Sequence, residues 1–527
     1  MSTRLPSPAT LLFALIVLAV LAGAFGRLYA LDRMVVWHDE VFTAVRVFGY
    51  HQGETTRTVF SGRLIAPADL LAFQKPSANR GWTDTLTALE EHPEHSPLYY
   101  LLARLTAGFI DDPLMAIRGA SATLSLLLIP AIFWLGRELF REDKAAWVAA
   151  GLVACSPLHL LYAQEARQYA LWAAITAAAS AAFLRAMRRQ RTTDWGLYAG
   201  LVALGLYSHL LFALVVAGHA LYGLLLTRRE GRRLGAFLRP WAASAGVSVL
   251  LFSPWIWVLI TGADRVERYT GWMARPISPL RIFENWGMHL VRTFVDWPAA
   301  GALLLLGLPP LGWLLWRFTR IAPRESVLFL TLLFGLFAGA VLLPDLVLGG
   351  SRSLHPRYLM PGLLAVELAV AYVLAMGWDS SSNRAWWMAR SGLVLLLVSG
   401  VASQLMILRA DTWWSKNYSW QNHMVARLVN ATERPLVLAS DGGVTVGEII
   451  SLAYDLKTEA RIWGEPAPGR PFPTEGFTDI FALTPSRELR AGLLKDYTLV
   501  PLLETWQWYR AIPKPTAGTS QSRAGPS

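Results

Sequence analysis

The chain has 527 residues, of which 54% are hydrophobic and only 16% are charged. Soluble domains carry roughly 25% charged residues, so this composition excludes an ordinary soluble enzyme, and the apolar content excludes a disordered chain. The single cysteine, Cys155, forms no internal disulfide, which excludes a disulfide scaffold. The net charge of +11 comes from basic residues between apolar runs, so it indicates membrane orientation rather than nucleic-acid binding.

Eleven apolar runs approach the roughly 20 residues that a helix needs to cross a bilayer. They predict spans at 10–31, 116–136, 145–162, 168–187, 195–208, 210–227, 240–260, 299–316, 325–344, 358–377 and 391–409. The first run also fits a signal peptide, because Arg4 precedes it. Its length and the lack of a clear cleavage site favour a retained span.

Basic residues predict the orientation of these spans. The apolar run at 97–110 is too short to span, and we expect it to lie in or near the outer interface. Without it, eighteen Lys and Arg fall in short segments on one side, which the positive-inside rule makes cytoplasmic. The sequence therefore predicts a multi-pass protein of the plasma (inner) membrane, with a cytoplasmic N-terminus and an extracytoplasmic C-terminus.

The composition changes after residue 409. Strand-like runs such as PLVLAS and TDIFALT alternate with helix-like runs such as TVGEIISLAYDL, which predicts a small α/β domain over 410–512. Residues 513–527 are rich in Pro, Ser and Gly and are expected to be disordered. We assign 1–409, including an outer loop at 32–115 with interfacial helices, to an α-helical transmembrane domain.

Two polar motifs lie in the first outer loop. Asp39 and Glu40 follow the first span, where a helix C-terminus disfavours acids; a carboxylate base facing a pocket and a solvated loop are both consistent with this pattern. Further on, His92 and His95 alternate with two glutamates ahead of Tyr99. These histidines are candidate metal ligands; a polar turn, or contact of one histidine or Tyr99 with an anionic substrate, are the alternatives.

Two more polar motifs fall on the same predicted side. Glu165 and Arg167 lie in a short turn between two spans, where burial is costly unless they pair with each other or line a wet cavity. His355 and Arg357 open the tenth span; Arg357 either binds phosphate or extends to the surface. Together the four motifs are stronger evidence for a functional site than any one of them. The basic residues, and not the motifs themselves, place all four on the same side of the membrane.

These motifs resemble those of a known family. WHDE at 37–40, HSPLYYLL at 95–102, SPLHLLYAQEARQYAL at 156–171 and HPRYLMP at 355–361 are similar to the C-type (GT-C) membrane glycosyltransferases, the group of the protein mannosyltransferases and lipid A aminoarabinose transferases. The resemblance covers about 1–410. It implies a GT-C fold, a sugar donor on a polyprenyl phosphate, and an acidic catalytic motif matched by Asp39 and Glu40. Glu165 and Arg167 match a second polar motif in which some relatives carry aspartate.

The residues fit that chemistry independently. A leaving phosphate needs cations, which Arg167 and Arg357 supply with His95 and His355 as alternatives. An acceptor hydroxyl gains from a carboxylate base, for which Asp39 is the first candidate. One base is sufficient for single displacement with inversion. No nucleotide-binding loop is visible, no cofactor is assigned, and a divalent metal stays open because relatives differ. The expected partners are the lipid-linked donor, the bilayer, and a glycan, lipid or protein acceptor.

Two other classes remain open. Glu367 lies in the middle of a predicted span, and an intramembrane acid favours a transporter or flippase for lipid-linked sugars. The alternative is a structural hydrogen bond to a histidine within the spans, such as His209 or His219. An inactive scaffold that presents the C-terminal domain is the third class, against which the intact acidic pair and arginines argue.

Overall fold

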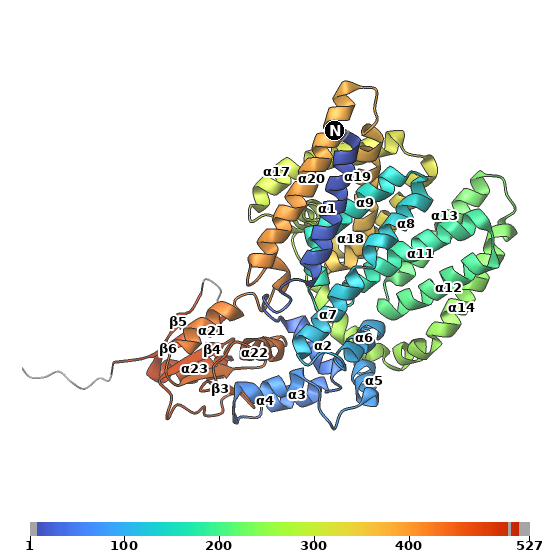
Figure 1. Cartoon of the computed structure of the whole chain (residues 1–527). Helices are drawn as coiled ribbons and strands as arrows, with labels where there is room; N and C mark the ends of the chain where they lie inside the picture. The colour runs from blue at the N-terminus through green and yellow to red at the C-terminus, as the bar shows by residue number, and fades with distance from the viewer. Residues whose placement is uncertain (1–7, 504–506, 516–527) are drawn as a thin grey trace, which may run out of the picture. The chain divides into compact units, whose positions relative to one another are not determined.

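A computed structural model describes residues 8–503 and 507–515 (Figure 1). The chain divides into two compact units. The first, the helical unit, comprises residues 1–33 and 82–410. The second, the sheet unit, comprises residues 34–81 and 411–527. Residues 516–527, which hold most of the tail predicted to be disordered, lie outside the described residues.

The helical unit is built from long apolar helices joined by short turns. In chain order the elements are α1 (Pro8–Leu28), α5 (Trp82–Glu90), α6 (Leu98–Thr106), α7 (Pro113–Ser125), α8 (Leu128–Phe140), α9 (Asp143–Cys155), α10 (Pro157–Ala163), α11 (Tyr169–Arg189), α12 (Thr192–Ser208), α13 (Phe212–Arg229), α14 (Leu234–Thr261), α15 (Ala263–Thr270), η2 (Gly271–Ala274), α16 (Pro279–Arg292), α17 (Ala300–Ile321), α18 (Arg324–Val347), η3 (Arg352–Leu354), η4 (Pro356–Leu359), α19 (Met360–Gly377) and α20 (Asn383–Arg409).

All eleven predicted spans are helical. Within the described residues, eight stretches are long and apolar enough to cross a membrane, and the bent pair α9–α10 would make a ninth. The two remaining predictions correspond to α12 and α13, which have 17 and 18 residues. The nine residues of α6 are too few to cross a bilayer, as expected for the run at 97–110.

Burial separates central from peripheral helices. The side chains of α11 and α19 are almost all buried, whereas those of α14 and α17 are mostly not. Because α14 and α17 are nonetheless apolar, their outer faces suit contact with lipid. The polar motif at 164–168 lies just before α11, and the motif at 355–358 lies just before α19.

Helix α1 is an integral part of the helical unit. A Cβ at Gly23 would collide with the Ala154 carbonyl of α9, so glycine allows the two backbones to approach closely. Near its end, the buried Arg27 donates to the carbonyl oxygens of Ser125 and Val153 at 2.6 and 2.9 Å. These contacts pack α1 against α7 and α9 within the helical unit.

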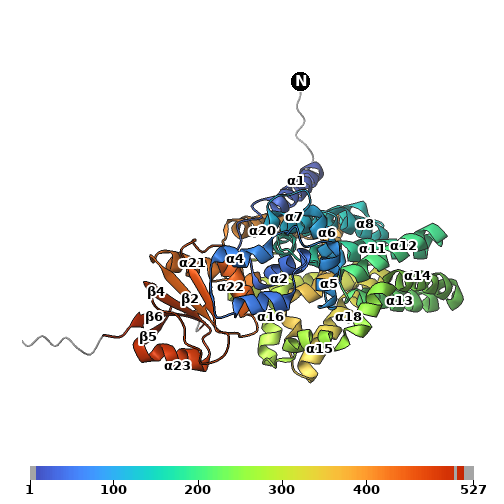
Figure 2. The same cartoon turned by 90° about the horizontal axis from the view of Figure 1, so that it is seen from below.

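The sheet unit has a six-stranded sheet of order β1-β3-β2-β4-β6-β5. Strands β2 (Pro435–Ala439), β3 (Arg461–Gly464) and β4 (Asp479–Leu483) are parallel; β1 (Leu64–Ile65), β5 (Tyr497–Pro501) and β6 (Trp508–Pro513) pair antiparallel. Its helices are α2 (His38–Val47), α3 (Gln52–Val59), α4 (Pro67–Leu71), η1 (Ala72–Gln74), η5 (Trp414–Lys416), α21 (Asn422–Asn430), α22 (Thr445–Ala453) and α23 (Arg487–Asp496). Figure 2 shows α21 and α23 on opposite sides of the sheet.

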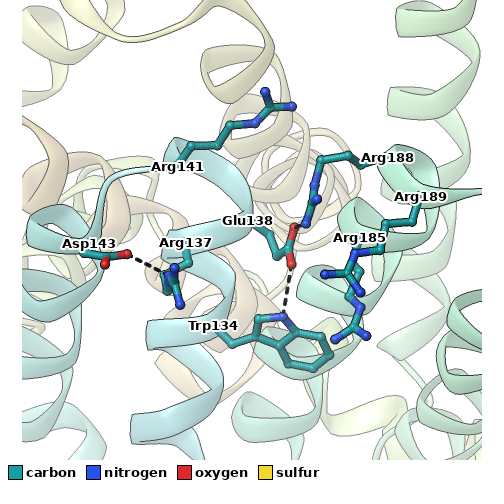
Figure 3. A pocket seen from close by; sticks show the side chains of 8 residues that line it. All are labelled: Trp134, Arg137, Glu138, Arg141, Asp143, Arg185, Arg188 and Arg189. Atoms are coloured by element: carbon teal, nitrogen blue, oxygen red, sulfur yellow. Dashed lines mark hydrogen bonds and ion pairs between the residues drawn. The ribbon is translucent and has the colours of Figure 1, made fainter.

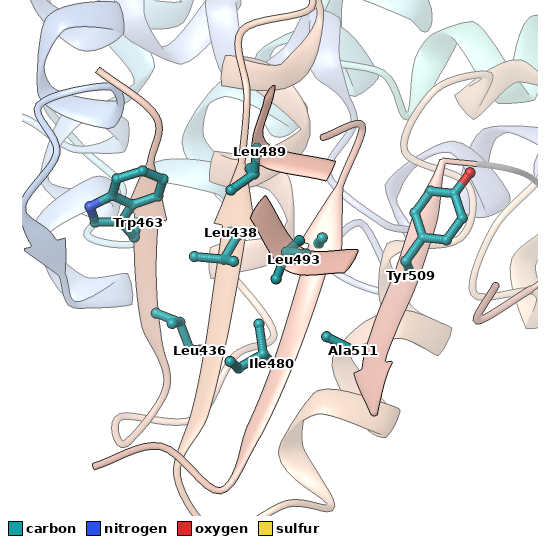
Figure 4. Close-up of a cluster of buried hydrophobic side chains, with 9 residues drawn as sticks. Leu436, Leu438, Trp463, Ile480, Leu489, Leu493, Tyr509 and Ala511 are labelled. Carbon is teal, nitrogen blue, oxygen red and sulfur yellow. The ribbon is translucent and has the colours of Figure 1, made fainter. Parts of the chain in front are cut away.

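Alternating strand residues form the core under α23. Leu436, Leu438 and Ile480 point toward Leu489 and Leu493 of α23 (Figure 4). This arrangement confirms the predicted α/β fold of the C-terminal region. The two quoted strand-like runs form β2 and β4, and the quoted helix-like run forms α22.

The two units divide the chain differently from the predicted domains in one respect. Residues 34–81, placed with the transmembrane domain from sequence, group with the C-terminal region. The physical reason is direct pairing, since Leu64 and Ile65 add β1 to the edge of the sheet beside β3. The segment that carries Asp39 and Glu40 is therefore part of the sheet unit.

Candidate active site

Asp39 and Glu40 lie in the first turn of α2, not at a helix C-terminus as the sequence suggested. Trp37 is the N-cap residue, and its extended backbone starts the helix at His38. Carboxylates are favoured at a helix N-terminus, where unsatisfied N–H groups create a positive potential. The expectation that these acids sit in a disfavoured position is thus wrong, because a second helix begins within the motif.

The two acids differ in environment. Asp39 is partly exposed, whereas Glu40 is fully buried. Glu40 Oε2 accepts from the Trp37 backbone N–H at 3.4 Å and lies 3.1 Å from Nζ of the buried Lys416. A buried carboxylate paired with lysine is suited to fix α2, and the partly exposed Asp39 is suited to meet a substrate.

The C-terminal region also holds the start of α2. The His38 backbone N–H donates to Ser419 Oγ at 3.0 Å, and Ser419 Oγ donates to Glu448 Oε1 at 2.6 Å. The His38 ring nitrogen Nδ1 lies 3.1 Å from the Val444 carbonyl oxygen. Burial raises the pKa of Glu448 to about 7, although the bond from Ser419 opposes this shift.

Sequence reasoning missed Lys416, Ser419 and Glu448. They follow Asp39 and Glu40 by several hundred residues and belong to no motif. The position of Lys416 in a stretch rich in tryptophan was the only available signal for any of them. The acid motif and the C-terminal region thus form one structure in the sheet unit.

Within the helical unit, two predicted arginines converge on one tyrosine. The guanidinium carbons of Arg167 and Arg357 lie 5.7 and 5.8 Å from the centre of the Tyr169 ring. Arg167 comes from the α10–α11 turn and Arg357 from η4, and both are at least nine-tenths buried. Two buried guanidinium groups around one ring offer grouped N–H donors of the kind that bind an oxyanion.

Aromatic and amide groups surround this pair. Arg167 donates to the hydroxyl oxygens of Tyr100 and Tyr169 at 3.3 and 3.4 Å, and the Tyr100 hydroxyl donates to Gln168 Oε1 at 3.4 Å. Glu165 is buried in the same turn, where its carbonyl accepts from the Arg167 backbone N–H at 2.7 Å. The turn therefore brings Glu165 and Arg167 together, and the sequence missed Tyr100 and Tyr169 as their neighbours.

Tyr99 makes a structural contact between α6 and α7. Its side chain is fully buried, and its hydroxyl donates to the Ile117 carbonyl oxygen on α7 at 2.8 Å. The adjacent Tyr100 is the residue that reaches Arg167. Successive helical residues point about 100° apart, so a one-residue difference decides which tyrosine faces the polar turn.

The histidine motif before α6 has glutamate at its centre. Glu94 Oε1 lies 3.4 Å from His92 Nδ1 and 3.6 Å from His95 Nε2. The His95 ring is 5.9 Å from the Tyr100 ring, which links it to the arginine region. Over residues 8–503 and 507–515, no group of three or more His, Cys, Asp or Glu is arranged to hold a metal ion.

His355 lies beside aromatic rings at the start of α19. Its ring centre is 5.3 Å from that of Trp272 and 6.0 Å from that of Tyr358. The Arg357 guanidinium lies 5.4 Å from the Tyr358 ring centre, so the HPRY motif forms one aromatic and cationic cluster. His355 and Arg357 are thus close in space as well as in sequence.

Glu367 pairs with a histidine, but not with either one named from the sequence. His159 Nε2 on α10 lies 2.9 Å from Glu367 Oε2 on α19, and both side chains are buried. His219 instead contacts Ser180 and Tyr198, and His209 stacks on Trp172. The naming of His209 and His219 is wrong because α10, rather than α12 or α13, faces this part of α19.

Comparisons with known proteins agree with this architecture. Residues 92–257 match the family model of the dolichyl-phosphate-mannose-protein mannosyltransferases. A comparison with curated protein sequences finds no match. The crystal structure of ArnT from Cupriavidus metallidurans bound to undecaprenyl phosphate superposes with a TM-score of 0.53 and 12% identity, covering 96% of this chain and 98% of that one.

The same ArnT in the apo state also gives a TM-score of 0.53, at 14% identity and the same coverage. The apo oligosaccharyltransferase from Archaeoglobus fulgidus has a TM-score of 0.48 and 13% identity over 86% of this chain and 64% of that one. The fold is that of the GT-C membrane glycosyltransferases, and the resemblance identified from the motifs is confirmed. The matched segment contains the histidine motif and the Arg167 turn.

Proposed function

We propose that the protein is an inverting glycosyltransferase that moves a sugar from a polyprenyl-phosphate donor to an acceptor hydroxyl on the extracytoplasmic face of the membrane. The observation that carries this proposal is the convergence of Arg167 and Arg357 on the Tyr169 ring. The GT-C fold supports it, because ArnT of this fold was crystallised with undecaprenyl phosphate.

Arg167 and Arg357 hold the donor phosphate in this proposal. A guanidinium presents a planar fork of N–H groups that matches two phosphate oxygens. When the sugar leaves, the phosphodiester becomes a monoester and its negative charge rises. Preorganised cations therefore stabilise the transition state more than the bound donor, which is the condition for catalysis rather than mere binding. His95 and His355 are secondary candidates for the same role.

Asp39 acts as the base. The acceptor oxygen forms a bond to the anomeric carbon, the bond from that carbon to the phosphate oxygen breaks, and the hydroxyl proton passes to the Asp39 carboxylate. Polyprenyl phosphate leaves with the bonding electrons. One displacement inverts the anomeric configuration. Glu40 takes no proton in this scheme; paired with Lys416, it positions α2 and hence Asp39.

The proposal extends to a hexose or pentose as the sugar and to a glycan, lipid or protein as the acceptor. No cofactor is required by these steps, because the donor is already activated by its phosphate. The lipid-linked donor also accounts for a polar region built among apolar helices, since such a donor has both a charged and an apolar part. His92 and His95 remain the candidate ligands if a divalent metal takes part.

The decisive experiment uses the purified full-length protein in lipid nanodiscs. A panel of synthetic polyprenyl-phosphate sugars is added with membrane extracts as acceptor source, and released polyprenyl phosphate is measured by mass spectrometry. We expect release of polyprenyl phosphate from at least one lipid-linked sugar, and no release of nucleoside phosphate when nucleotide sugars are supplied instead. Movement of intact lipid-linked sugar across proteoliposomes without cleavage would favour the transporter alternative. Comparing surface glycans with and without the protein identifies the product.

A further inference from the structure

A second basic region contains none of the residues proposed for transfer. A cavity of about 570 Å³ opens between the end of α8, the start of α9 and the end of α11 (Figure 3). Five arginines line it, together with Trp134, Glu138 and Asp143: Arg137, Arg141, Arg185, Arg188 and Arg189. Five cations against two carboxylates leave the cavity wall with a net positive charge.

Three of these arginines are already neutralised. Arg137 pairs with Asp143 at 2.7 Å and Arg188 with Glu138 at 2.5 Å, as Figure 3 shows. Arg185 pairs with Asp194 of α12 at 2.7 Å. These pairs hold the cavity wall together, since they join α8 to α9 and α11 to both α8 and α12.

Arg141 and Arg189 are different. Both are exposed, and neither has an ion-pair partner among the residues that the structure describes. Arg141 follows α8 in the left-handed conformation, φ 57°, and its backbone N–H donates to the Arg137 carbonyl oxygen at 3.0 Å. Arg141 and Arg189 therefore border a cavity in which both carboxylates already pair with other arginines. An anionic ligand would neutralise the remaining positive charge.

The position of the cavity selects a lipid as the source of the anion. Two candidate membrane spans, Pro113–Phe140 and Tyr169–Arg189, both end at it. A cavity at the end of two spans lies where phospholipid headgroups lie. Trp134 on its wall is typical of that interface, because its indole ring has an apolar body and a polar N–H, which here lies 3.4 Å from Glu138 Oε1.

We propose that this cavity binds the phosphate group of an anionic phospholipid, with Arg141 and Arg189 as its ligands. Basic pockets between membrane helices are suited to such headgroups. The cavity lining includes none of Asp39, Arg167 and Arg357, the residues proposed for sugar transfer. Its occupant bridges the ends of α8 and α11, so bound anionic lipid stabilises the packing of these two helices.

The test measures lipid retained by the detergent-solubilised full-length protein, using native mass spectrometry with phosphatidylglycerol and phosphatidylcholine as probes. We expect phosphatidylglycerol to bind preferentially. The double substitution Arg141→Gln/Arg189→Gln should weaken that binding about tenfold or more, since each change removes a direct charge-assisted contact to the lipid phosphate. Both side chains are exposed, so the fold and donor cleavage should persist.

The matched control is Arg228→Gln/Arg229→Gln, which removes two exposed arginines at the end of α13 and causes the same change in net charge. We expect it to change phosphatidylglycerol binding by less than about twofold. Equal losses of phosphatidylglycerol binding in the two double variants would show that net charge alone attracts the lipid. That result would overturn the proposed site. Displacement of the lipid by inorganic phosphate at equal concentration would assign the cavity to a soluble anion instead.

Discussion

Lys416 Nζ lies 3.1 Å from Glu40 Oε2, and both side chains are buried in the sheet unit. The pair joins the acid motif after the first span to a lysine 376 residues further along the chain. Removal of one member of a buried ion pair leaves an uncompensated charge, whereas removal of both does not. This relationship makes the role of Glu40 testable separately from that of Asp39.

We expect Glu40→Gln to destabilise the start of α2 by about 3–5 kcal/mol, because Lys416 is left buried without its carboxylate. Hydrogen exchange of residues 34–47 should accelerate, and donor cleavage should fall with it. The double variant Glu40→Gln/Lys416→Met should recover most of the protection and part of the activity. Normal exchange combined with lost cleavage in Glu40→Gln would instead place Glu40 in the chemistry.

Asp39→Asn should reduce sugar transfer by about 10²–10⁴-fold, the usual contribution of a general base. The amide keeps the shape of the carboxylate but accepts no proton, so hydrogen exchange of α2 should stay close to that of the parent. Asp32→Asn, a neighbouring exposed acid, is the matched control and should transfer normally. Near-normal transfer by Asp39→Asn would remove Asp39 from the mechanism.

Arg167→Lys and Arg357→Lys should each lower kcat by about tenfold or more, even though the charge is retained. Lysine lacks the planar fork, and the contacts are expected to strengthen as phosphate charge rises in the transition state. Arg352→Lys is the control. Arg352 lies in the segment just before Arg357, and its guanidinium pairs with Asp345 at 3.1 Å. If both test variants match the parent at equal folded amounts, the phosphate contact belongs to another cation.

Glu448 should make the sheet unit less stable as pH rises. Burial raises its pKa from 4.5 to about 7 in the folded protein, so between these values the folded state holds a proton that the unfolded state has lost. Stability then falls through this range, by on the order of 3 kcal/mol in total. Glu448→Gln should flatten this dependence in hydrogen-exchange measurements of α22 at pH 5 and pH 8. An unchanged slope would show that Glu448 does not carry the proton.

The predicted orientation is tested with reporters. A fusion after Arg510 to a reporter that works only outside the cytoplasm should be active, and the same reporter after Arg229 should be silent. The expectation rests on the placement of the basic residues, including those that line the cavity at the ends of α8 and α11. The reverse pattern would place the C-terminal region in the cytoplasm and exclude transfer on the outer face.

Much of the fold follows from local sequence pattern. Long apolar runs became helices, the alternating runs of the C-terminal region became the strands and helices expected of them, and the short run at 97–110 became a nine-residue helix. These features are predictable because hydrophobic periodicity and length act within a single element. The motifs around Asp39, Arg167 and Arg357 were also visible, since polar residues in a membrane chain stand out against apolar neighbours.

Only the tertiary structure decided which partners these residues have. The sequence determined that Glu40 is an acid beside a span, but its burial and its bond to Lys416 depend on contacts across the whole sheet unit. From the sequence, Tyr99 was the candidate, but Tyr100 is the tyrosine bonded to Arg167. Likewise His219 was a candidate partner of Glu367, but His159 is the histidine bonded to it. The physical reason is that hydrophobic patterning specifies which face of a helix is buried, whereas the identity of a long-range partner depends on how separate helices pack against one another.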